Sequence, residues 1–304
     1  MSAAVAVAAE GALAGEFDLR GKTCMVTGAS DGIGLAAATA FAGAGAEVVM
    51  VVRNEERGKA AAERIRAAHP DAKLDLELAD LSSQAAIRGL GERYVASKRP
   101  LHVLVNNAGV WQTARKLSVD GIELTFATNM LGYFLVTKVL EPALVRSAPS
   151  RMVAVGSGLA GGLDFDDINF DKRSWGAIKP GVAAYAQSKQ ANRMWTWALA
   201  RKLAGTGVTA NIMNPNNTRT GAFKKGGGPL AWIVHFGNLF VSESAAKGAD
   251  TAVWLAASTE LDGVTGKYWE KRKECECAFR DPAKEDAVWE LCERLTSASA
   301  TPAA

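Results

Sequence analysis

Cysteine and histidine are scarce in this chain of 304 residues, and their scarcity argues against a disulfide-rich protein and against a metal-binding protein. Four cysteines are too few for a disulfide scaffold of this length, and they favour reduced thiols in a reducing, cytoplasmic compartment. Cys275 and Cys277 are one residue apart and lack the spacing and the second ligand pair of a zinc site. The three histidines, His69, His102 and His235, have no metal-ligand spacing. We therefore expect no metal.

An excess of charge of one sign and a long apolar run are also lacking. Lys and Arg total 35 against 32 Asp and Glu, and the net charge of +3 is far from what a nucleic-acid binder needs. An Ala/Val-rich run near the start is too short to span a membrane, and no Lys or Arg precedes Arg20 as in a signal peptide. We expect no nucleic-acid partner, no transmembrane span, a mobile arm over residues 1–20 and a disordered tail over 297–304.

The composition instead fits one large folded domain, which we place at residues 21–296. Hydrophobic residues make up 48% and charged residues 22%, as in average soluble globular proteins. Short β-branched runs alternate with Ala-rich amphipathic stretches, a pattern typical of successive βαβ units around a parallel sheet. The predicted strands are 23–27, 47–52, 73–78, 101–106, 151–155, 208–213 and 266–269, and the predicted helices are 32–44, 55–68, 83–97, 120–147, 183–203 and 242–257.

A glycine-rich turn directly follows the first predicted strand and opens a helix. In this context Gly28 allows a tight turn, Gly32 lets the backbone approach a pyrophosphate, and Gly34 permits close helix–strand contact. The helix N-terminus adds unpaired N–H groups and a partial positive charge. The turn therefore predicts a dinucleotide site, and its sequence is Thr27-Gly28-Ala29-Ser30-Asp31-Gly32-Ile33-Gly34.

The end of the second predicted strand indicates which dinucleotide is bound. An NAD site has an acid there for the ribose 2′-hydroxyl, whereas this chain has Arg53 and Asn54. A guanidinium attracts a 2′-phosphate and binds it in bidentate fashion, with Ser30 as a further donor. We predict NADP(H); the alternative is an NAD enzyme in which Arg53 is a solvated loop charge. Asp80 and Leu81 are placed to contact adenine, although Asp80 also fits an ordinary helix-entry residue.

Two side chains suited to proton transfer lie four residues apart, Tyr185 and Lys189. In a helix this spacing puts them on one face as neighbours. A free tyrosine hydroxyl has a pKa of about 10, so it is mostly the wrong species to act as a base near neutrality. A nearby ammonium and an oxidised nicotinamide would favour the phenolate. The pair is therefore a candidate site for acid–base chemistry.

Together, these motifs resemble those of the short-chain dehydrogenase/reductase family in its single-domain branch. The glycine-rich turn, Asn106-Asn107-Ala108-Gly109 and the Tyr185–Lys189 pair occur in the family's order, and the match covers about residues 22–296. The resemblance implies an α/β fold of Rossmann type: a doubly wound, seven-stranded parallel sheet with helices on both faces. It also implies an NADP(H)-dependent oxidoreductase, with Asn107, Ala108 and Gly109 beside the cofactor.

The resemblance further implies a catalytic Asn and Ser, matched here by Asn129 and Ser157. Tyr185 would donate a proton to a carbonyl oxygen as hydride arrives, or remove it in alcohol oxidation, and Ser157 would hydrogen-bond the same oxygen. Lys189 would lower the pKa of Tyr185 and hold the nicotinamide ribose, while Asn129 would position a water linking Lys189 to solvent. Taken singly, Ser157 also fits a turn hydroxyl and Asn129 an internal helix amide.

Within the family, the chain is most similar to the retinol-dehydrogenase-like and WW-domain-oxidoreductase-like group. Between Ser157 and Tyr185 it has an insertion that contains Leu163-Asp164-Phe165-Asp166-Asp167-Ile168-Asn169-Phe170, which resembles that group's FDDLN-type insertion. The resemblance implies lipophilic aldehydes, ketones and alcohols such as retinoids, steroids and terpenoids. Two irregular stretches, 158–181 and a lid at about 221–240, are expected to shape the substrate pocket. The candidate lining residues, each of which also fits plain packing, are Trp111, Trp175, Phe223, Trp232, His235 and Phe236.

One departure from the family's pattern follows the sixth predicted strand. The family usually has Pro-Gly there, whereas this chain has Pro215 followed by Asn216. Asn tolerates a positive φ, so the backbone path survives, but its side chain crowds the nicotinamide edge. We expect Pro215, Asn216, Thr218 and Thr220 to contact the cofactor. The alternative to an enzyme is an NADP(H)-binding sensor or scaffold of the same fold with weak catalysis.

The resemblance also bears on assembly. It implies homodimer contacts through the helices predicted over 120–147 and 183–203, with a compact monomer as the alternative. Trp195 and Trp197 are two residues apart on the second of these helices, so they lie on different faces. We expect at least one of them to pack away from the site or against a partner.

Overall fold

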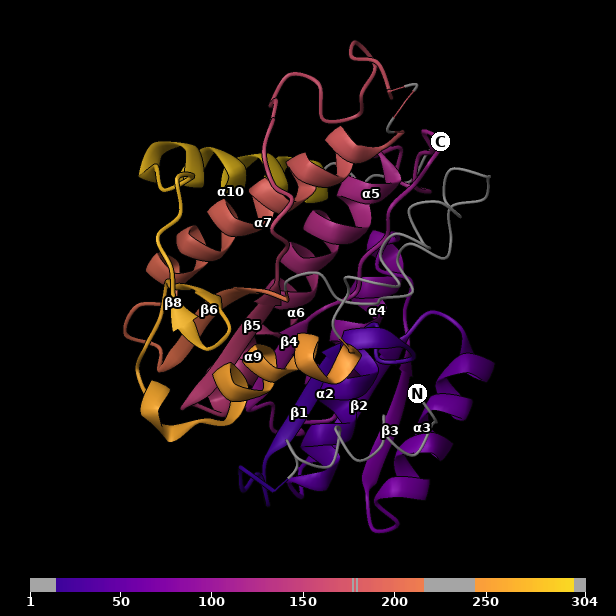
Figure 1. The fold of residues 1–304 in the computed structure, drawn as a ribbon, viewed down its shortest axis with the longest axis vertical. Helices are drawn as coiled ribbons and strands as arrows, with labels where there is room; N and C mark the ends of the chain where they lie inside the picture. Colours follow the sequence, from indigo (N-terminus) through magenta and orange to yellow (C-terminus); the bar gives the residue numbers. More distant parts are fainter. Residues whose placement is uncertain (1–14, 177, 179, 216–243, 298–304) are drawn as a thin grey trace.

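The computed structural model describes residues 15–176, 178, 180–215 and 244–297, which form one sheet of eight strands covered by helices (Figure 1). The strand order is β3-β2-β1-β4-β5-β6-β7-β8. The strands are β1 (Thr23–Thr27), β2 (Glu47–Val52), β3 (Lys73–Leu78), β4 (Val103–Asn106), β5 (Ser150–Val155), β6 (Val208–Asn214), β7 (Tyr268–Glu270) and β8 (Lys273–Glu274). The prediction of an α/β fold around a parallel sheet is confirmed for β1 to β7.

The predicted count of seven strands is wrong by one, because β8 extends the sheet and pairs with β7 in antiparallel fashion. β8 has two residues, Lys273 and Glu274, and both are exposed. A strand this short and polar has no period-two pattern, so periodicity gave no sign of it.

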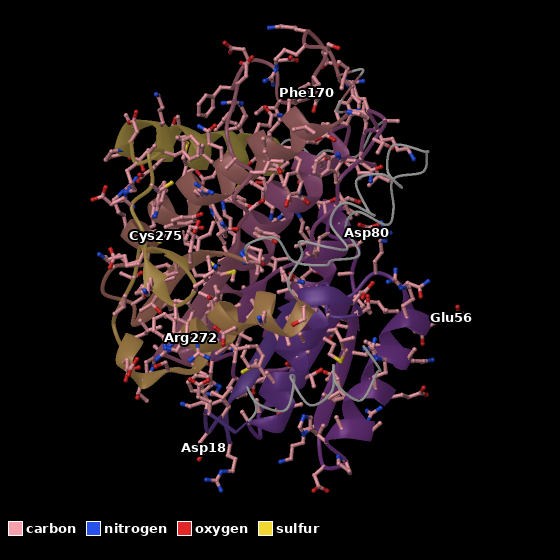
Figure 2. The ribbon with its side chains drawn as sticks, viewed as in Figure 1. Asp18, Glu56, Asp80, Phe170, Arg272 and Cys275 are labelled. Atoms are coloured by element: carbon pink, nitrogen blue, oxygen red, sulfur yellow. The ribbon has the colours of Figure 1, made fainter. Side chains whose placement is uncertain are left out.

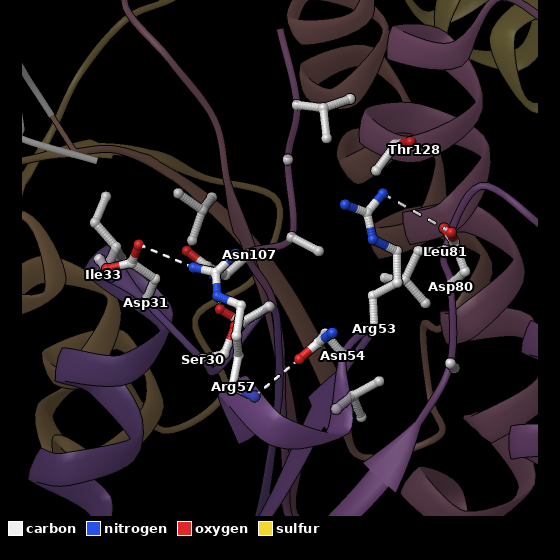
Figure 3. A pocket seen from close by; sticks show the side chains of 18 of the residues that line it. Ser30, Asp31, Ile33, Arg53, Asn54, Arg57, Asp80, Leu81, Asn107 and Thr128 are labelled. Atoms are coloured by element: carbon white, nitrogen blue, oxygen red, sulfur yellow. Dashed lines mark hydrogen bonds and ion pairs between the residues drawn. The ribbon is translucent and has the colours of Figure 1, made fainter. Parts of the chain in front are cut away.

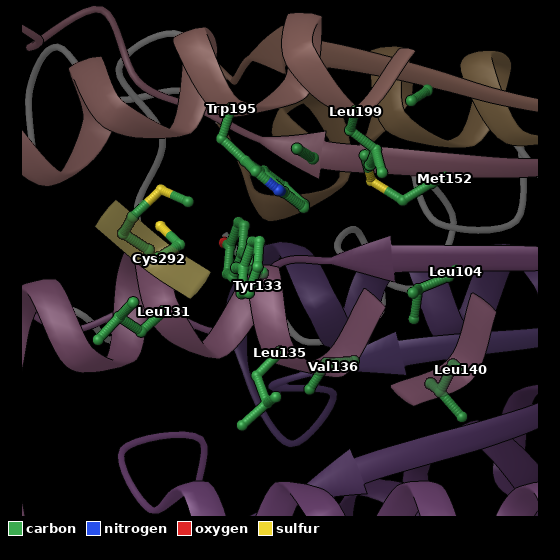
Figure 4. Close-up of a cluster of buried hydrophobic side chains, with 14 of the residues drawn as sticks. Leu104, Leu131, Tyr133, Leu135, Val136, Leu140, Met152, Trp195, Leu199 and Cys292 are labelled. Carbon is green, nitrogen blue, oxygen red and sulfur yellow. The ribbon is translucent and has the colours of Figure 1, made fainter. Parts of the chain in front are cut away.

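Helices cover both faces of the sheet. One face carries α2 (Gly32–Gly43), α3 (Glu55–Ala68) and α9 (Ala245–Ala257), with a 3₁₀ turn (Thr259–Leu261) after α9. The other carries α4 (Gln84–Ala96), α6 (Gly132–Arg146) and α7 (Val182–Lys202), and Figure 4 shows Tyr133 of α6 and Trp195 of α7 in the hydrophobic cluster beneath them. Side-chain caps begin four of these helices, since Asp31, Asn54, Ser83 and Ser244 each accept a bond from a backbone N–H.

The helix predicted over 120–147 is interrupted. Glu123 is buried and its two carboxylate oxygens accept bonds from the N–H groups of Thr125 (2.7 Å) and Phe126 (2.8 Å), which starts α5 (Leu124–Phe126). A π-helical turn (Ala127–Leu131) then leads into α6. Such turns are rare and are frequent at functional sites, and this one carries Asn129.

A helix that we did not predict, α10 (Pro282–Ser297), lies along α7 (Figure 1). Its buried positions Val288, Leu291 and Cys292 follow helical spacing within a charged segment, so a signal was present in the sequence. Because the sheet lies on one side of α7 and α10 on another, Trp195 and Trp197 are both buried inside the chain. Most of α7 between Ala184 and Ala200 is buried within the chain, and the homodimer contact stays a prediction.

The predicted ends and lid fall partly outside the described residues. Within the expected arm, Leu19 is buried and its N–H donates to the Ala44 carbonyl (2.8 Å), while Glu16 pairs with Arg272. Figure 2 shows Asp18 at the opposite end of the molecule from Phe170 of the insertion. The domain limits 21–296 stay a prediction, and the lid at 221–240 lies outside the described residues.

The described ranges contain neither a membrane-spanning helix nor a cluster of metal-binding side chains. No helix there combines the length and apolarity that crossing a membrane requires. In the same ranges, no three His, Cys, Asp or Glu side chains are grouped so as to hold a metal ion.

Candidate active site

A cleft opens at the carboxyl ends of β1, β2, β4 and β5, around the point where the strand order reverses between β1 and β4. In doubly wound sheets this is where ligands bind. The structure brings fifteen of the predicted residues together along its walls: Gly28, Ser30, Asp31, Gly32, Ile33, Arg53, Asn54, Asp80, Leu81, Asn107, Ala108, Gly109, Tyr185, Lys189 and Pro215. Seven further lining residues were not predicted: Val51, Arg57, Ala79, Val110, Thr128, Val155 and Gly156.

The floor of the cleft is a close approach of backbone segments that only glycine permits. Gly28 has φ +68°, and a Cβ there would lie 2.9 Å from the Cα of Ala108. A Cβ on Gly34 would lie 2.4 Å from both the Gly28 carbonyl oxygen and Nδ2 of Asn107. Gly34 therefore packs the helix against the turn, as predicted for it, and does not itself line the cleft.

Asn107 holds the loop after β4 against the end of β1. Its side-chain Nδ2 donates to the Thr27 carbonyl (2.8 Å), and its backbone N–H donates to Thr27 Oγ1 (2.9 Å). The N–H of Ala108 donates to the same hydroxyl oxygen (3.1 Å). These bonds fix both loops at the cleft mouth and account for the Asn side chain without a ligand.

Two arginines reach the cleft, Arg53 directly after β2 and Arg57 from the first turn of α3 (Figure 3). Arg53 faces Asp80 across it, with 3.9 Å between Nη1 and Oδ2, and Nη2 of Arg57 lies 3.3 Å from Oδ2 of Asp31. Side chains of both arginines are about half exposed, so these surface pairs are weak and leave both guanidinium groups available. Arg57 was missed by sequence reasoning, although its place in the first turn of the helix that follows Arg53 brings it near the end of β2.

Asp80 and Asn54 also have structural roles. Asp80 Oδ1 accepts bonds from the N–H (2.9 Å) and the hydroxyl (2.7 Å) of Ser82, which fits the helix-entry alternative as well as a place beside the cleft. Asn54 Oδ1 accepts from the N–H of Arg57 (2.9 Å) and so caps α3.

Tyr185 lies at the inner end of the cleft, and the Ser157 side chain is close enough to act on the pKa of its hydroxyl. Ser157 Oγ also accepts from the N–H of Leu159 (3.1 Å), and the ring of Trp111 stacks on that of Tyr185, with centroids 5.2 Å apart and planes 19° apart. Burial raises the pKa of Tyr185 above its usual value, and the interaction with the Ser157 side chain only partly offsets this. The hydroxyl is therefore held as a neutral proton donor at physiological pH.

Lys189 lies one turn further along α7 and is buried. Its Nζ donates to the Val155 carbonyl (2.8 Å) and lies 5.9 Å from the Tyr185 ring centroid. Burial, followed by the positive charge of Arg193, lowers the pKa of Lys189 to about 7. In the chain alone the effect expected of Lys189 on Tyr185 thus does not prevail, because desolvation favours the neutral form of both groups.

Asn129 lies close by but is bound within the protein. Its Oδ1 accepts from the N–H of Val110 (2.8 Å), and its Nδ2 donates to the Val110 carbonyl (3.0 Å) and to Ser188 Oγ (3.2 Å). Its backbone carbonyl accepts from Nδ2 of Asn192 (2.8 Å). The side chain thus fits the alternative of an internal helix amide, and the water-positioning role stays a prediction.

The insertion is anchored by one buried carboxylate. Asp167 accepts backbone N–H bonds from Asp171 (2.7 Å), Lys172 (3.1 Å) and Arg173 (2.9 Å), and a side-chain bond from Arg173 Nε (3.0 Å). Desolvation opposes its ionisation, but these bonds outweigh it and lower the pKa of Asp167 to about 2. Nη2 of Arg173 also donates to Oε1 of Gln187 (2.9 Å), which ties the insertion to α7.

The aromatic pocket candidates separate into two groups. Trp111 covers Tyr185 and its Nε1 donates to the Pro180 carbonyl (3.0 Å), which joins the loop after β4 to the end of the insertion. Trp175 packs edge-on against Phe170 (5.5 Å) within the insertion, as the plain alternative expected. The remaining predicted positions lie outside the described residues: Asn216, Thr218, Thr220, Phe223, Trp232, His235 and Phe236.

The lowered pKa of Lys189 makes the stability of the ligand-free protein depend on pH. Between about pH 7 and the unfolded-state pKa of about 10.4, the unfolded chain binds one more proton than the native one, so raising the pH favours folding. From pH 7 to pH 9 we expect wild type to gain about 2 kcal/mol in unfolding free energy relative to Lys189→Met. Urea titrations of both proteins at the two pH values measure this, and parallel pH profiles would contradict it.

Comparison with known proteins gives a consistent set of relatives. Residues 22–164 match the family model described as short chain dehydrogenase. Retinol dehydrogenase 13 of Homo sapiens is 33% identical over 303 residues, covering 95% of this chain and 87% of that protein. The WW domain-containing oxidoreductase of Gallus gallus is 34% identical over 291 residues, covering 91% of this chain and 69% of that protein.

Solved structures agree with these sequence matches. A 3-oxoacyl (acyl-carrier-protein) reductase from Agrobacterium tumefaciens, crystallised with NADP bound, has a TM-score of 0.65 and 26% identity. That match covers 83% of this chain and 93% of the reductase.

Proposed function

Since the chain belongs to the short-chain dehydrogenase family, we propose that it uses NADP(H) to interconvert a carbonyl group and a primary or secondary alcohol on a lipophilic small molecule. The observation that carries this proposal is the meeting of the Tyr185 and Ser157 hydroxyls beside Lys189, at the inner end of the cleft. A cleft without these groups would bind a dinucleotide but would have no means of moving a proton.

The residues of the cleft fit NADP(H). The glycine floor leaves room for a pyrophosphate beside the N-terminus of α2. Arg53 and Arg57 offer two guanidinium groups to a 2′-phosphate, at the place where a site for NAD has an acid. The Agrobacterium reductase with NADP bound supports this choice. Lys189 would hold the nicotinamide ribose, and the bound nicotinamide would supply or accept the hydride.

The proton chemistry belongs to the chain's own side chains. The usual pKa of a tyrosine, about 10, already keeps the Tyr185 hydroxyl protonated near neutral pH, and burial raises it further, so the hydroxyl is able to donate that proton to a substrate oxygen. Ser157, held by the Leu159 N–H, would donate a second hydrogen bond to the same oxygen as negative charge develops on it. In alcohol oxidation the same hydroxyl groups would act in reverse.

An apolar substrate suits the walls beyond Tyr185. The Trp111 ring, stacked on Tyr185, presents an aromatic surface next to the reacting position. The names of the relatives, which include retinol dehydrogenases, support a lipophilic substrate class. Turnover of a panel of aldehydes and ketones, including retinal, with NADPH tests the proposal. Tight NADPH binding without any turnover would instead favour the sensor or scaffold alternative.

The 2′-phosphate assignment predicts a selective loss of affinity. Replacing Arg53 by Ala removes a charged hydrogen-bond donor worth about 1.5–3 kcal/mol, so the Kd for NADPH should rise about 10- to 100-fold while that for NADH stays the same. Fluorescence titration of both cofactors measures this. Lys59→Ala, which removes an equal charge from α3 outside the cleft, is the control. Equal Kd changes for NADPH and NADH would contradict the assignment.

A further inference from the structure

We propose that Arg193 is a positioning residue that holds the Ser157 segment in place for catalysis. The proposal rests on the proposed function, because it concerns the loop that carries one of the two hydroxyl groups facing the substrate. Arg193 is outside the cleft lining, and none of the motifs in the sequence includes it.

Arg193 connects the loop after β5 with β7 and with the segment after β8. It lies one helical turn beyond Lys189 on α7 and is 7% exposed. Its Nη2 donates to the Ser157 carbonyl oxygen and to the Tyr268 hydroxyl (3.0 Å), and its Nη1 donates to Cys277 Sγ (3.3 Å). One rigid guanidinium therefore joins three segments that are far apart in the sequence.

The contacts continue beyond the guanidinium. The Tyr268 hydroxyl donates to Oε1 of Glu270 (2.7 Å), and Nδ2 of Asn214 donates to the same oxygen (2.8 Å). Asn214 is the last residue of β6 and directly precedes Pro215 at the cleft. The network thus links the Ser157 loop to the strand ends that border the cleft.

Packing alone does not account for an arginine here. The guanidinium lies over the rings of Tyr268 (4.4 Å) and Phe279 (5.5 Å), a setting in which an apolar side chain would pack well. Among the described residues Arg193 forms no salt bridge, and its buried Nε has no hydrogen-bond partner. A buried charge without a direct counter-ion costs free energy, whereas a neutral residue of similar volume would avoid that cost.

Ser157 is fixed from two sides when Arg193 is present. The Leu159 N–H holds its hydroxyl oxygen (3.1 Å), and Arg193 holds its backbone carbonyl. The charge of Arg193 also reaches Lys189, where it contributes to the lowered pKa. Loss of Arg193 should free the Ser157 carbonyl and let the Ser157 hydroxyl move away from the hydroxyl of Tyr185.

Hydrogen exchange and kinetics of Arg193→Met test the proposal. We expect exchange of the Leu159 amide to accelerate at least about tenfold, because a lost bond to a charged group is worth about 1.5–3 kcal/mol. We expect kcat to fall about 10- to 100-fold, with KM for NADPH within about twofold of wild type. Arg280→Met is the matched control, since Arg280 lies over the ring of Trp197 (4.6 Å), and it should leave both values unchanged.

A second variant and the turnover of the wild-type protein distinguish failure of this proposal from failure of the proposed function. If Arg193→Met does not fold, Tyr268→Phe removes only a hydroxyl from the network and should still speed exchange at Leu159 by a smaller factor. Unchanged exchange at Leu159 in the folded variant overturns the proposal, whatever the activity. A wild-type protein that lacks turnover, with accelerated exchange in Arg193→Met, would instead remove the proposed function and leave the positioning contact standing.

Discussion

The Tyr185→Phe variant is expected to lose about 10²- to 10⁴-fold in kcat, the range that a positioned general acid contributes. The substitution deletes the hydroxyl near Ser157 and keeps the ring that stacks on Trp111. The cofactor site should therefore be preserved, and the Kd for NADPH should change by less than about twofold. Steady-state kinetics with an accepted aldehyde, together with cofactor titration, measure both quantities.

A second tyrosine provides the control. Tyr94 is buried in α4, and its hydroxyl donates to the Pro100 carbonyl (2.8 Å), away from the cleft. Tyr94→Phe removes an equivalent group and should leave kcat unchanged. Full turnover by Tyr185→Phe would refute the assignment of Tyr185 as the proton donor.

The Trp195→Ala variant is expected to lose about 3–5 kcal/mol of unfolding free energy, as large aromatic truncations in cores do. Trp195 is fully buried and lies in the cluster with Tyr133 and Cys292, between α7 and its neighbours (Figure 4). The helix that this side chain anchors also carries Tyr185 and Lys189. Urea unfolding of the ligand-free protein measures the loss.

Trp195→Phe separates packing from polarity at this position. The buried indole Nε1 has no hydrogen-bond partner among the described residues, so removing it relieves a desolvated donor while most of the apolar surface remains. The loss for Trp195→Phe should thus be well below that for Trp195→Ala. Equal losses of unfolding free energy in the two variants would contradict the view that the apolar surface kept by Phe stabilises α7.

The parts of the fold that were predictable are those in which local pattern and tertiary role agree. Strands β1 and β2 have the predicted bounds because buried parallel strands are continuous apolar runs. The bounds of β3 were predictable from its alternation of apolar and charged residues, and those of α3 from its strong cap, Asn54. The π-helical turn was not predictable, since a helical period continues through 127–131. β8 was too short to leave a pattern.

The candidate site shows the same division. Spacing alone placed Tyr185 and Lys189 on one face of a helix, and the glycine turn was predicted from its position after a strand. The directions of the pKa shifts of Tyr185 and Lys189 were not predictable from spacing, because they depend on how deeply the two groups are buried. Arg193 was missed because its partners Ser157 and Tyr268 are distant in the sequence and carry no spacing signal.

The position of α10 against α7 has a consequence for synthesis. On the ribosome, α7 emerges well before α10, and the strands β6 and β7 also follow it. Until α10 arrives, the side of α7 on which α10 packs lacks the cover that α10 gives it. The enzyme should thus gain its working geometry only late in translation, and a chaperone that binds apolar helices would find its substrate in that interval.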